Sequence, residues 1–350
     1  MAWRGPIGVL IVAFILAVVF HMVEYRFAFE VATFSVGVLL VYFGSEFSVV
    51  GFKDLSLNIG ISRYFAGLTS SIASNLPELV VSILILRRAL AFGDSELAEV
   101  AVLSVVTATG FNSLLLGLLI VMVTMRTGAL KFPYEAMRHE SHLIRLSIVV
   151  SMLIFALGVL EWEAGSEPVL PRPVGVFLLL IYAVYVFFMY LSCGSDEEKP
   201  SMSFGRAALY SAAGVLLIFI GGHLISGFVE EAISRMGLSV VSAALIVGAS
   251  GSIPEHAIAL IGAARGELEL SLGNLIAGMI QCILIIFGLI SVFTPIVLDG
   301  FILFQFVAVA GILWIVKKAI LDDGQLTIDE GLFIIILQTM LFILLEELRV

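Results

Sequence analysis

Residues 69–78 read Thr-Ser-Ser-Ile-Ala-Ser-Asn-Leu-Pro-Glu, and residues 248–256 read Gly-Ala-Ser-Gly-Ser-Ile-Pro-Glu-His. The two Pro-Glu pairs are 177 positions apart, and the same offset relates Gly37-Val38-Leu39-Leu40 to Gly214-Val215-Leu216-Leu217. The chain therefore contains an internal repeat, and each copy places a glutamate inside a long apolar run. A carboxylate at bilayer depth costs about 2.5–3.5 kcal/mol on insertion scales, so two at equivalent places indicate one shared ion site.

The composition is that of a membrane protein. Of the 350 residues, 61% are hydrophobic and 13% are charged, and a soluble fold of this length cannot bury so much apolar surface. We therefore expect an all-α, polytopic membrane protein whose first partner is the lipid bilayer. The net charge of −10 argues against nucleic acid as a partner. The two cysteines, Cys193 and Cys282, indicate neither a disulfide framework nor a metal cluster.

Eleven apolar runs are long enough to cross a bilayer, for which about 20 residues are needed. We expect the first run to be a retained helix and not a signal peptide, because no small-x-small cleavage pattern follows it before His21. The predicted spans are residues 6–23, 31–51, 64–90, 97–125, 143–161, 174–191, 207–229, 239–264, 268–294, 300–319 and 328–346.

The repeat divides ten of these spans into two groups of five. It pairs the second span with the seventh and the third with the eighth, and an odd number of helices per group forces opposite orientations in the membrane. The chain is thus predicted to be an inverted repeat with one additional helix. The predicted domains are the N-terminal extra helix (1–29), the first five-helix repeat (30–191, motif around 69–117), an acidic cytoplasmic linker (192–204) and the second five-helix repeat (205–350, motif around 248–288).

The positive charges of the loops predict the orientation. With the N-terminus on one side, that side collects twelve Lys and Arg residues and the other side six. The positive-inside rule then places the N-terminus in the cytoplasm and the C-terminus outside, in what we expect to be a prokaryotic cell membrane. The linker contains Asp196-Glu197-Glu198, which we interpret as a solvated connector; a loose patch that collects divalent cations is the alternative.

Each Pro-Glu pair predicts a broken helix beside an ion site. Proline has no N–H and clashes with the preceding turn, so it frees backbone carbonyls upstream. These carbonyls, the nearby hydroxyls and the carboxylate are the hard oxygen ligands that Ca²⁺ prefers. Two such breaks that meet at the membrane midplane would bring both glutamates to one cation, whereas a simple kink is the alternative. The candidate ligands are Glu78, Glu255, Ser74, Asn75, Gly251 and Ser252.

Further polar residues of the predicted spans are candidates for a gate or for a supporting role around that site. Asn112 and Gln281 lie on the helix after each Pro-Glu pair, where each either holds a carboxyl or the ion, or forms an interhelical hydrogen bond. Glu46 and His223 are equivalent in the repeat and form a proton route or gate, or else face water at helix ends. His256 either tunes the preceding glutamate or packs through a hydrogen bond.

Both motifs resemble the α-repeats of the Ca²⁺/cation antiporter superfamily. The second copy is the better match, through Pro254-Glu255-His256 and Leu272-Gly273-Asn274-Leu275-Ile276-Ala277-Gly278. The first keeps Pro77-Glu78-Leu79-Val80-Val81-Ser82-Ile83, but its following loop is about eight residues longer. The resemblance implies a cation antiporter. The sequence has no His-Glu-x-x-His run and no cofactor fingerprint, so we expect neither an enzyme nor a cofactor.

Two branches of that superfamily compete. The cation/proton exchangers have Asn three residues before the first Glu, then Glu-Leu, Glu-His and a Gln on the following helix, and this chain is similar to them in Asn75, Glu78-Leu79, Glu255-His256 and Gln281. The sodium/calcium exchangers have Pro-Glu in both repeats, which this chain shares. They also have an Asn or Asp on the helix after the glutamate, where Gly278 and Met279 stand in the second copy here.

Proton coupling needs no ligands beyond the two glutamates. Two carboxyls close together in a low-dielectric cavity repel each other when ionised, so they hold protons when no cation is bound and titrate as a pair. The sequence therefore predicts exchange of Ca²⁺, or another divalent cation, for H⁺, with both bound competitively by Glu78 and Glu255. The alternatives are Na⁺/Ca²⁺ exchange on the same scaffold and, less suited to tight binding, a passive cation channel.

Overall fold

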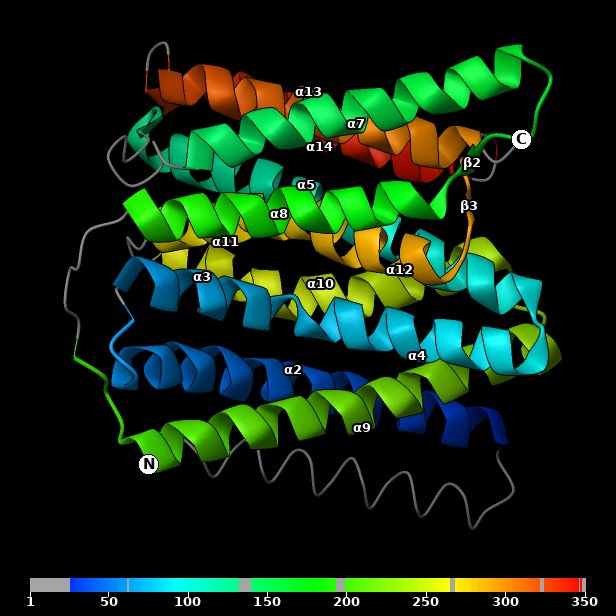
Figure 1. Cartoon of the computed structure of the whole chain (residues 1–350), viewed down its shortest axis with the longest axis horizontal. Helices are drawn as coiled ribbons and strands as arrows, with labels where there is room; N and C mark the ends of the chain where they lie inside the picture. Colours follow the sequence, from blue (N-terminus) through cyan, green and yellow to red (C-terminus); the bar gives the residue numbers. More distant parts are fainter. Residues whose placement is uncertain are drawn as a thin grey trace. The chain divides into compact units, whose positions relative to one another are not determined.

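The computed structural model describes residues 26–61, 63–131, 140–192, 199–264, 268–321, 324–345 and 347, and most of them are helical (Figure 1). The helices are α2 (Arg26–Asn58), α3 (Arg63–Ser74), α4 (Leu76–Phe92), α5 (Ser95–Thr127), α7 (Glu140–Glu163), α8 (Arg172–Ser192), α9 (Phe204–Met236), α10 (Val240–Ala264), α11 (Leu268–Gln281), the π-helix η1 (Cys282–Phe287), α12 (Gly288–Phe293), α13 (Gly300–Leu321) and α14 (Ile328–Ile343).

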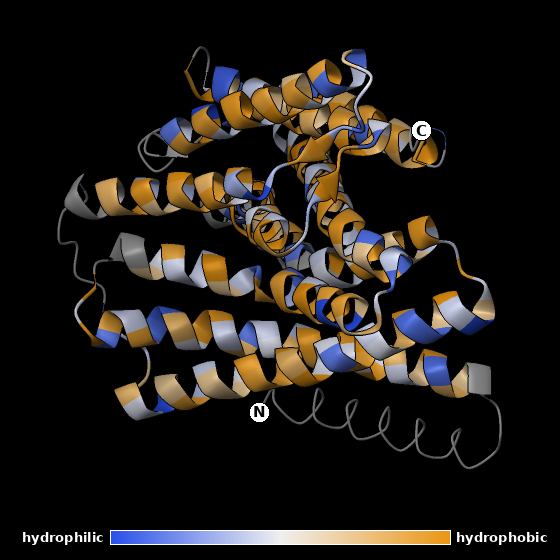
Figure 2. Cartoon of the chain, turned by 45° about the vertical axis from the view of Figure 1, so that its right-hand side comes forward, coloured by the Kyte–Doolittle hydropathy of each residue, from blue (hydrophilic) through white to orange (hydrophobic). Residues whose placement is uncertain are grey.

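The chain is an all-α, polytopic membrane protein, as the composition predicts. Each of the ten expected spans between residues 31 and 346 coincides with a helix or with helices that follow one another directly. Six of the described helices are long and apolar enough to cross a membrane, and the total is seven if the bent pair α3–α4 forms one span. Apolar residues run along these helices (Figure 2). The first expected span, residues 6–23, lies outside the described residues, and the total of eleven stays a prediction.

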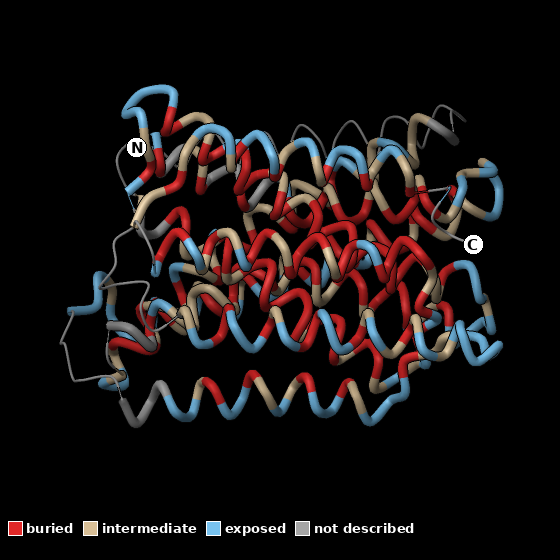
Figure 3. The backbone as a smooth tube through the Cα atoms, turned by 90° about the horizontal axis from the view of Figure 1, so that it is seen from above, coloured by how far each residue is buried: buried red, intermediate tan, exposed pale blue. Residues whose placement is uncertain are grey.

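The helices form two compact units. Unit 1 comprises Met1–Ser104 and Gly194–Gly251, and unit 2 comprises Val105–Cys193 and Ser252–Val350. Two of the three boundaries fall inside helices, so α5 and α10 each contribute their first part to unit 1 and their second part to unit 2. Within each unit, buried and exposed turns alternate along the helices (Figure 3), because one face of a helix packs while the other faces outward.

In unit 1, α2 and α9 lie side by side with their backbones in close contact (Figure 1). A Cβ atom added at Gly214 would lie 2.4 Å from the Oγ of Ser48 and 2.6 Å from the carbonyl oxygen of Gly44. One added at Gly221 would lie 2.6 Å from the carbonyl oxygen of Gly37. Small residues permit such close approach between membrane helices, where van der Waals packing supplies much of the attraction.

Polar contacts hold both ends of α9 in the same unit. Near its beginning, the buried carboxylate of Asp54 accepts hydrogen bonds from the hydroxyl of Ser201 (2.6 Å) and the backbone N–H of Met202 (2.8 Å). Towards its other end, Glu230 forms an ion pair with Arg88 of α4. Under the 177-residue offset, Asp54 and Arg88 correspond to Glu231 and Arg265 in the other copy.

Unit 2 contains two short antiparallel ladders besides its helices. Strand β1 (Leu130–Lys131) pairs with β4 (Gln325–Leu326), and β2 (Val169–Leu170) pairs with β3 (Ile296–Val297). The ladders join the connections between helices, while α13 packs against α7 and α12 against α8. The unit thus ties its loop segments together outside the helical spans.

Asp299 lies between β3 and α13, outside the spanning segments. Its Oδ1 accepts a hydrogen bond of 2.8 Å from the backbone N–H of Ile302, which caps the first turn of α13. Burial raises the pKa of Asp299 from 3.8 to about 6, although the backbone hydrogen bonds oppose the shift. The ionised form is therefore less favourable in the folded chain than in the unfolded one.

Gly214→Ala is expected to lower the stability of the purified protein, because the new methyl group has to separate two helix backbones. Overpacking of this kind typically costs about 1–3 kcal/mol. Gly205→Ala, also in α9, is the matched control, because no atom lies within 4 Å of its added Cβ. Thermal unfolding in detergent measures both variants. Equal melting temperatures for the two variants would contradict close packing of α2 against α9.

Asp299→Asn is expected to change how stability depends on pH. A carboxyl whose pKa is raised on folding destabilises the folded state once it ionises, so the wild type loses stability as the pH rises from 3.8 to about 6. Asparagine keeps the capping oxygen without the charge. The stability of the variant should therefore rise relative to that of the wild type across that window, by about 3 kcal/mol in all.

Melting curves recorded between about pH 4 and pH 8 test this expectation. Asp94→Asn is the control, because Asp94 also accepts a hydrogen bond from a first-turn N–H, that of Leu97 (3.1 Å). If the melting temperatures of the wild type and Asp299→Asn changed with pH in parallel over the whole range, ionisation of Asp299 would not lower the stability of the folded protein, and the expectation would be contradicted.

Candidate functional site

The first Pro-Glu motif forms a broken helix, as predicted. Helix α3 ends at Ser74, α4 begins at Leu76, and the two meet at an angle of 42°. The cause is Asn75: its side-chain amide donates to the carbonyl of Ser71 (3.0 Å), four residues back. Its backbone N–H bonds instead to Ile72, three residues back (3.2 Å). An asparagine that competes for its own helix in this way ends the helix.

The second motif is not broken, and this part of the prediction is wrong. Helix α10 continues from Val240 to Ala264 through Pro254. Proline removes one backbone hydrogen bond, and membrane helices tolerate this where neighbours supply partners. Ser252, the counterpart of Asn75, donates its hydroxyl to the carbonyl of Ala108 on α5 (3.4 Å).

Unit 1 brings together four of the candidate ligands. The side chains of Glu78, Asn75 and Ser74 are all buried, with exposed fractions of 4%, 4% and 3%. Glu78 packs against Gly251 of the second motif: a Cβ added there would lie 3.1 Å from its Cγ and 3.3 Å from its Cδ. The missing side chain at residue 251 thus makes room for the carboxyl of Glu78.

Glu255 and Ser252 belong to unit 2. Glu255 lies in α10 four residues after Gly251, and its side chain is outside the described part of the structure. Ser252 is fully buried. A burial as complete as that of Glu78 requires a compensating charge or a full set of hydrogen bonds for any ionised carboxylate.

The two candidate amides are fully or almost fully buried in unit 2. The Nε2 of Gln281 donates to the hydroxyl of Tyr182 on α8 (3.0 Å), so this residue forms the interhelical hydrogen bond that was one of its two predicted roles. The Nδ2 of Asn112 lies 3.9 Å from the Sγ of Cys282. His256 is also fully buried.

Glu46 and His223 are exposed on α2 and α9 of unit 1. Their predicted role as a gate or proton route stays a prediction. Among the described residues no group of three or more His, Cys, Asp and Glu side chains is placed to hold a metal ion; Glu255 is not among the side chains described.

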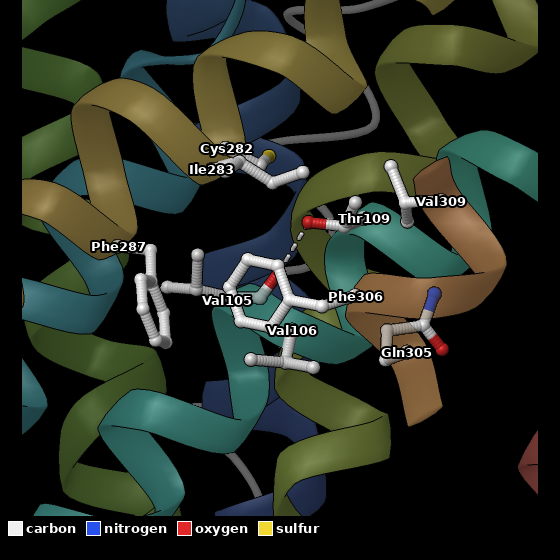
Figure 4. Close-up of a pocket in the computed structure, with 9 residues that line it drawn as sticks. All are labelled: Val105, Val106, Thr109, Cys282, Ile283, Phe287, Gln305, Phe306 and Val309. Carbon is white, nitrogen blue, oxygen red and sulfur yellow. Dashed lines mark hydrogen bonds between the residues drawn. The ribbon is translucent and has the colours of Figure 1, made fainter. Parts of the chain in front are cut away.

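A feature that sequence reasoning missed follows Gln281. The helix changes there to the π-helix η1, and such π-turns are frequent at functional sites. In unit 2, Cys282 and Phe287 of η1 and Thr109 of α5 line a small, largely apolar cavity together with Gln305 of α13 (Figure 4). No sequence pattern signals a π-helix, because the extra residue per turn is set by packing.

The chain belongs to the sodium/calcium exchanger protein family, whose pattern it matches over residues 29–191 and 206–345. This match covers both predicted repeats and omits the acidic linker. It confirms the resemblance that the two Pro-Glu motifs indicate.

Two curated bacterial relatives and two solved structures illustrate the family. The chain is 25% identical to inner membrane protein YrbG of Escherichia coli K12 over 279 residues, 74% of this chain and 78% of that protein. It is 23% identical to the Ca²⁺/H⁺ antiporter ChaA of Bacillus subtilis 168 over 307 residues, 81% of this chain and 84% of that protein.

The fold is similar to that of the H⁺/Ca²⁺ exchanger CAX, with a TM-score of 0.68, 15% identity and coverage of 99% of this chain and 94% of the other. It is also similar to the sodium–calcium exchanger NCX_Mj, with a TM-score of 0.63, 18% identity and coverage of 91% and 99%.

Proposed function

We propose that the protein is a secondary antiporter that exchanges Ca²⁺ for H⁺ across a prokaryotic cell membrane. The observation that carries the proposal is the burial of Glu78 beside Gly251, which joins a carboxylate of the first motif to the backbone of the second. A buried carboxylate among small polar residues suits a hard cation or a proton, and both neutralise it.

The second carboxylate of the site is Glu255. Glu255 is the counterpart of Glu78 under the 177-residue offset, so the repeat supplies the second carboxylate. Their carboxylates bind Ca²⁺ in one state and protons in the other. The further oxygen ligands are supplied by Ser74, Asn75, Gly251 and Ser252.

The relatives' names support both possible coupling ions. ChaA and CAX are described as Ca²⁺/H⁺ exchangers, and the motif residues Asn75, His256 and Gln281 favour that branch. Na⁺/Ca²⁺ exchange is the second candidate, because Pro77 and Pro254 are typical of the sodium branch and the fold is also similar to NCX_Mj. Sodium coupling needs additional anionic ligands, which the sequence does not provide near the two glutamates.

Contacts in unit 1 support the inverted repeat. Gly37 is equivalent to Gly214, and Gly44 to Gly221, in the sequence repeat. The contacts are crossed: Gly37 touches Gly221, and Gly44 touches Gly214. A two-fold relation between two copies produces such reciprocal pairs.

A second reciprocal pair follows the same rule. A Cβ added at Gly51 would lie 2.4 Å from the backbone nitrogen of Ser211. In the sequence repeat, Gly51 is equivalent to Phe228 and Ser211 is equivalent to Phe34. The rings of Phe228 and Phe34 also lie in contact, with their centroids 4.7 Å apart. We therefore propose that α2 and α9 are related by a two-fold axis and move together during alternating access, with Glu46 and His223 on their exposed surfaces.

The orientation stays as the loop charges predict it, with the N-terminus in the cytoplasm and the C-terminus outside. A passive channel is disfavoured because tightly bound ions leave slowly. The transport measurement below separates a channel from an exchanger.

Proteoliposomes should accumulate ⁴⁵Ca²⁺ when a pH gradient is the only driving force. Glu78→Gln and Glu255→Gln should each abolish that uptake, because either change removes a carboxylate that both ions need, and the variants should remain folded. Glu163→Gln, on the exposed end of α7, is the carboxylate control.

Uptake driven only by a Na⁺ gradient would contradict proton coupling and indicate Na⁺/Ca²⁺ exchange. Passive equilibration of ⁴⁵Ca²⁺ without either gradient would indicate a channel. Undiminished exchange by Glu78→Gln would contradict the shared carboxylate site.

Gly251→Ala is expected to weaken Ca²⁺ binding, because its methyl group would lie 3.1 Å from the Cγ of Glu78 and displace the carboxyl. Gly67→Ala in α3 is the matched control, since no atom lies within 4 Å of its added Cβ. Calorimetric titration of the purified variants with Ca²⁺ should show a loss of about tenfold for the first change only, or about 1.4 kcal/mol. Equal Ca²⁺ affinities for Gly251→Ala and Gly67→Ala would show that Glu78 is not a ligand of the Ca²⁺ site.

A further inference from the structure

Among the fully buried polar side chains of unit 2, two on different helices have atoms for which the described residues provide no hydrogen-bond partner and lie close to one glycine. They are His256, at both ring nitrogens, and Asn112, at its Oδ1. A buried donor or acceptor left unpaired costs about 1–3 kcal/mol. Two such groups on neighbouring helices, α10 and α5, therefore point to a ligand.

The two side chains face the same point above Gly278 of α11. A Cβ added at Gly278 would lie 2.9 Å from the Nδ2 of Asn112 and 3.2 Å from the Nε2 of His256. The absence of a side chain at residue 278 therefore leaves the imidazole and the amide facing each other across one small space. A rotation of the Asn112 side-chain amide by 180° exchanges its oxygen and nitrogen, and it would turn Oδ1 towards His256.

A sulfur atom completes the group. The Sγ of Cys282 lies 3.9 Å from the Nδ2 of Asn112 and belongs to a fully buried side chain of η1. Cys282 also lines the small cavity of unit 2, next to Ile283 and across from Thr109 (Figure 4). The combined donors are an imidazole nitrogen, a thiol sulfur and an amide oxygen.

These donors differ in kind from those of the proposed Ca²⁺ site. Calcium takes oxygen ligands almost exclusively, whereas thiolate and imidazole ligands favour Zn²⁺. We propose that His256, Cys282 and Asn112 form a Zn²⁺ site in unit 2 whose donors do not include the two glutamates. Zinc replaces the thiol proton of Cys282, which passes to solvent, and neutral His256, the Oδ1 of Asn112 and one water molecule complete a four-coordinate shell.

The site does not depend on the exchange reaction, so its test measures metal binding directly. One equivalent of Zn²⁺ is added to the purified full-length protein, and zinc X-ray absorption and calorimetry are recorded. The absorption spectrum should show one sulfur at about 2.3 Å and nitrogen or oxygen at about 2.0–2.1 Å. Cys282→Ser should remove the sulfur shell and weaken Zn²⁺ binding by about tenfold or more. Cys193→Ser, which changes the other cysteine, should leave both unchanged.

A second pair of variants leaves every donor in place. Gly278→Ala should fill the space between the imidazole and the amide and weaken Zn²⁺ binding, whereas Gly311→Ala in α13 has no atom within 4 Å of its added Cβ and should not. A wild-type spectrum without sulfur, or a sulfur shell retained in Cys282→Ser, would overturn the proposal. Loss of Zn²⁺ binding in Glu78→Gln with normal binding in Cys282→Ser would do so too, by assigning the ion to the glutamates.

Discussion

The structure depends on one constraint: a carboxylate inside an apolar helical protein has to be neutralised. Glu78 is 4% exposed and lies against the backbone of Gly251. A cation and a proton both satisfy it, but they cannot occupy the same oxygen together, and this competition is sufficient to couple two fluxes. The broken helix α3–α4 serves the same constraint, because Asn75 ends α3 directly before the turn that holds Glu78.

Close backbone contact is the second element of the account. Glycines at equivalent places in the two copies face each other crosswise, so α2 and α9 approach more closely than larger residues permit. Such an interface has few side chains that can rearrange, and it favours movement of the two helices as one body. Asp54 and Arg88 add polar contacts near the two ends of α9, where the helices leave the apolar region.

Much of the fold followed from sequence, because ten apolar runs and a gap-free repeat leave few arrangements for a membrane chain. The break at Asn75 was predicted from Pro77, although the asparagine side chain causes it. The same rule failed at Pro254, where Ser252 bonds to α5 and α10 continues. The π-helix after Gln281 and the group formed by His256, Asn112 and Cys282 could not be predicted, because they depend on how three helices pack.

The most direct test of the central claim is the number of protons released when Ca²⁺ binds to the purified protein. If Glu78 and Glu255 hold protons that Ca²⁺ displaces, adding Ca²⁺ to a weakly buffered sample will acidify it, and the apparent affinity will fall as the pH is lowered. In Glu78→Gln both effects will be reduced. Binding of Ca²⁺ without proton release, at an affinity that does not change with pH, would contradict competition at a shared pair of carboxylates.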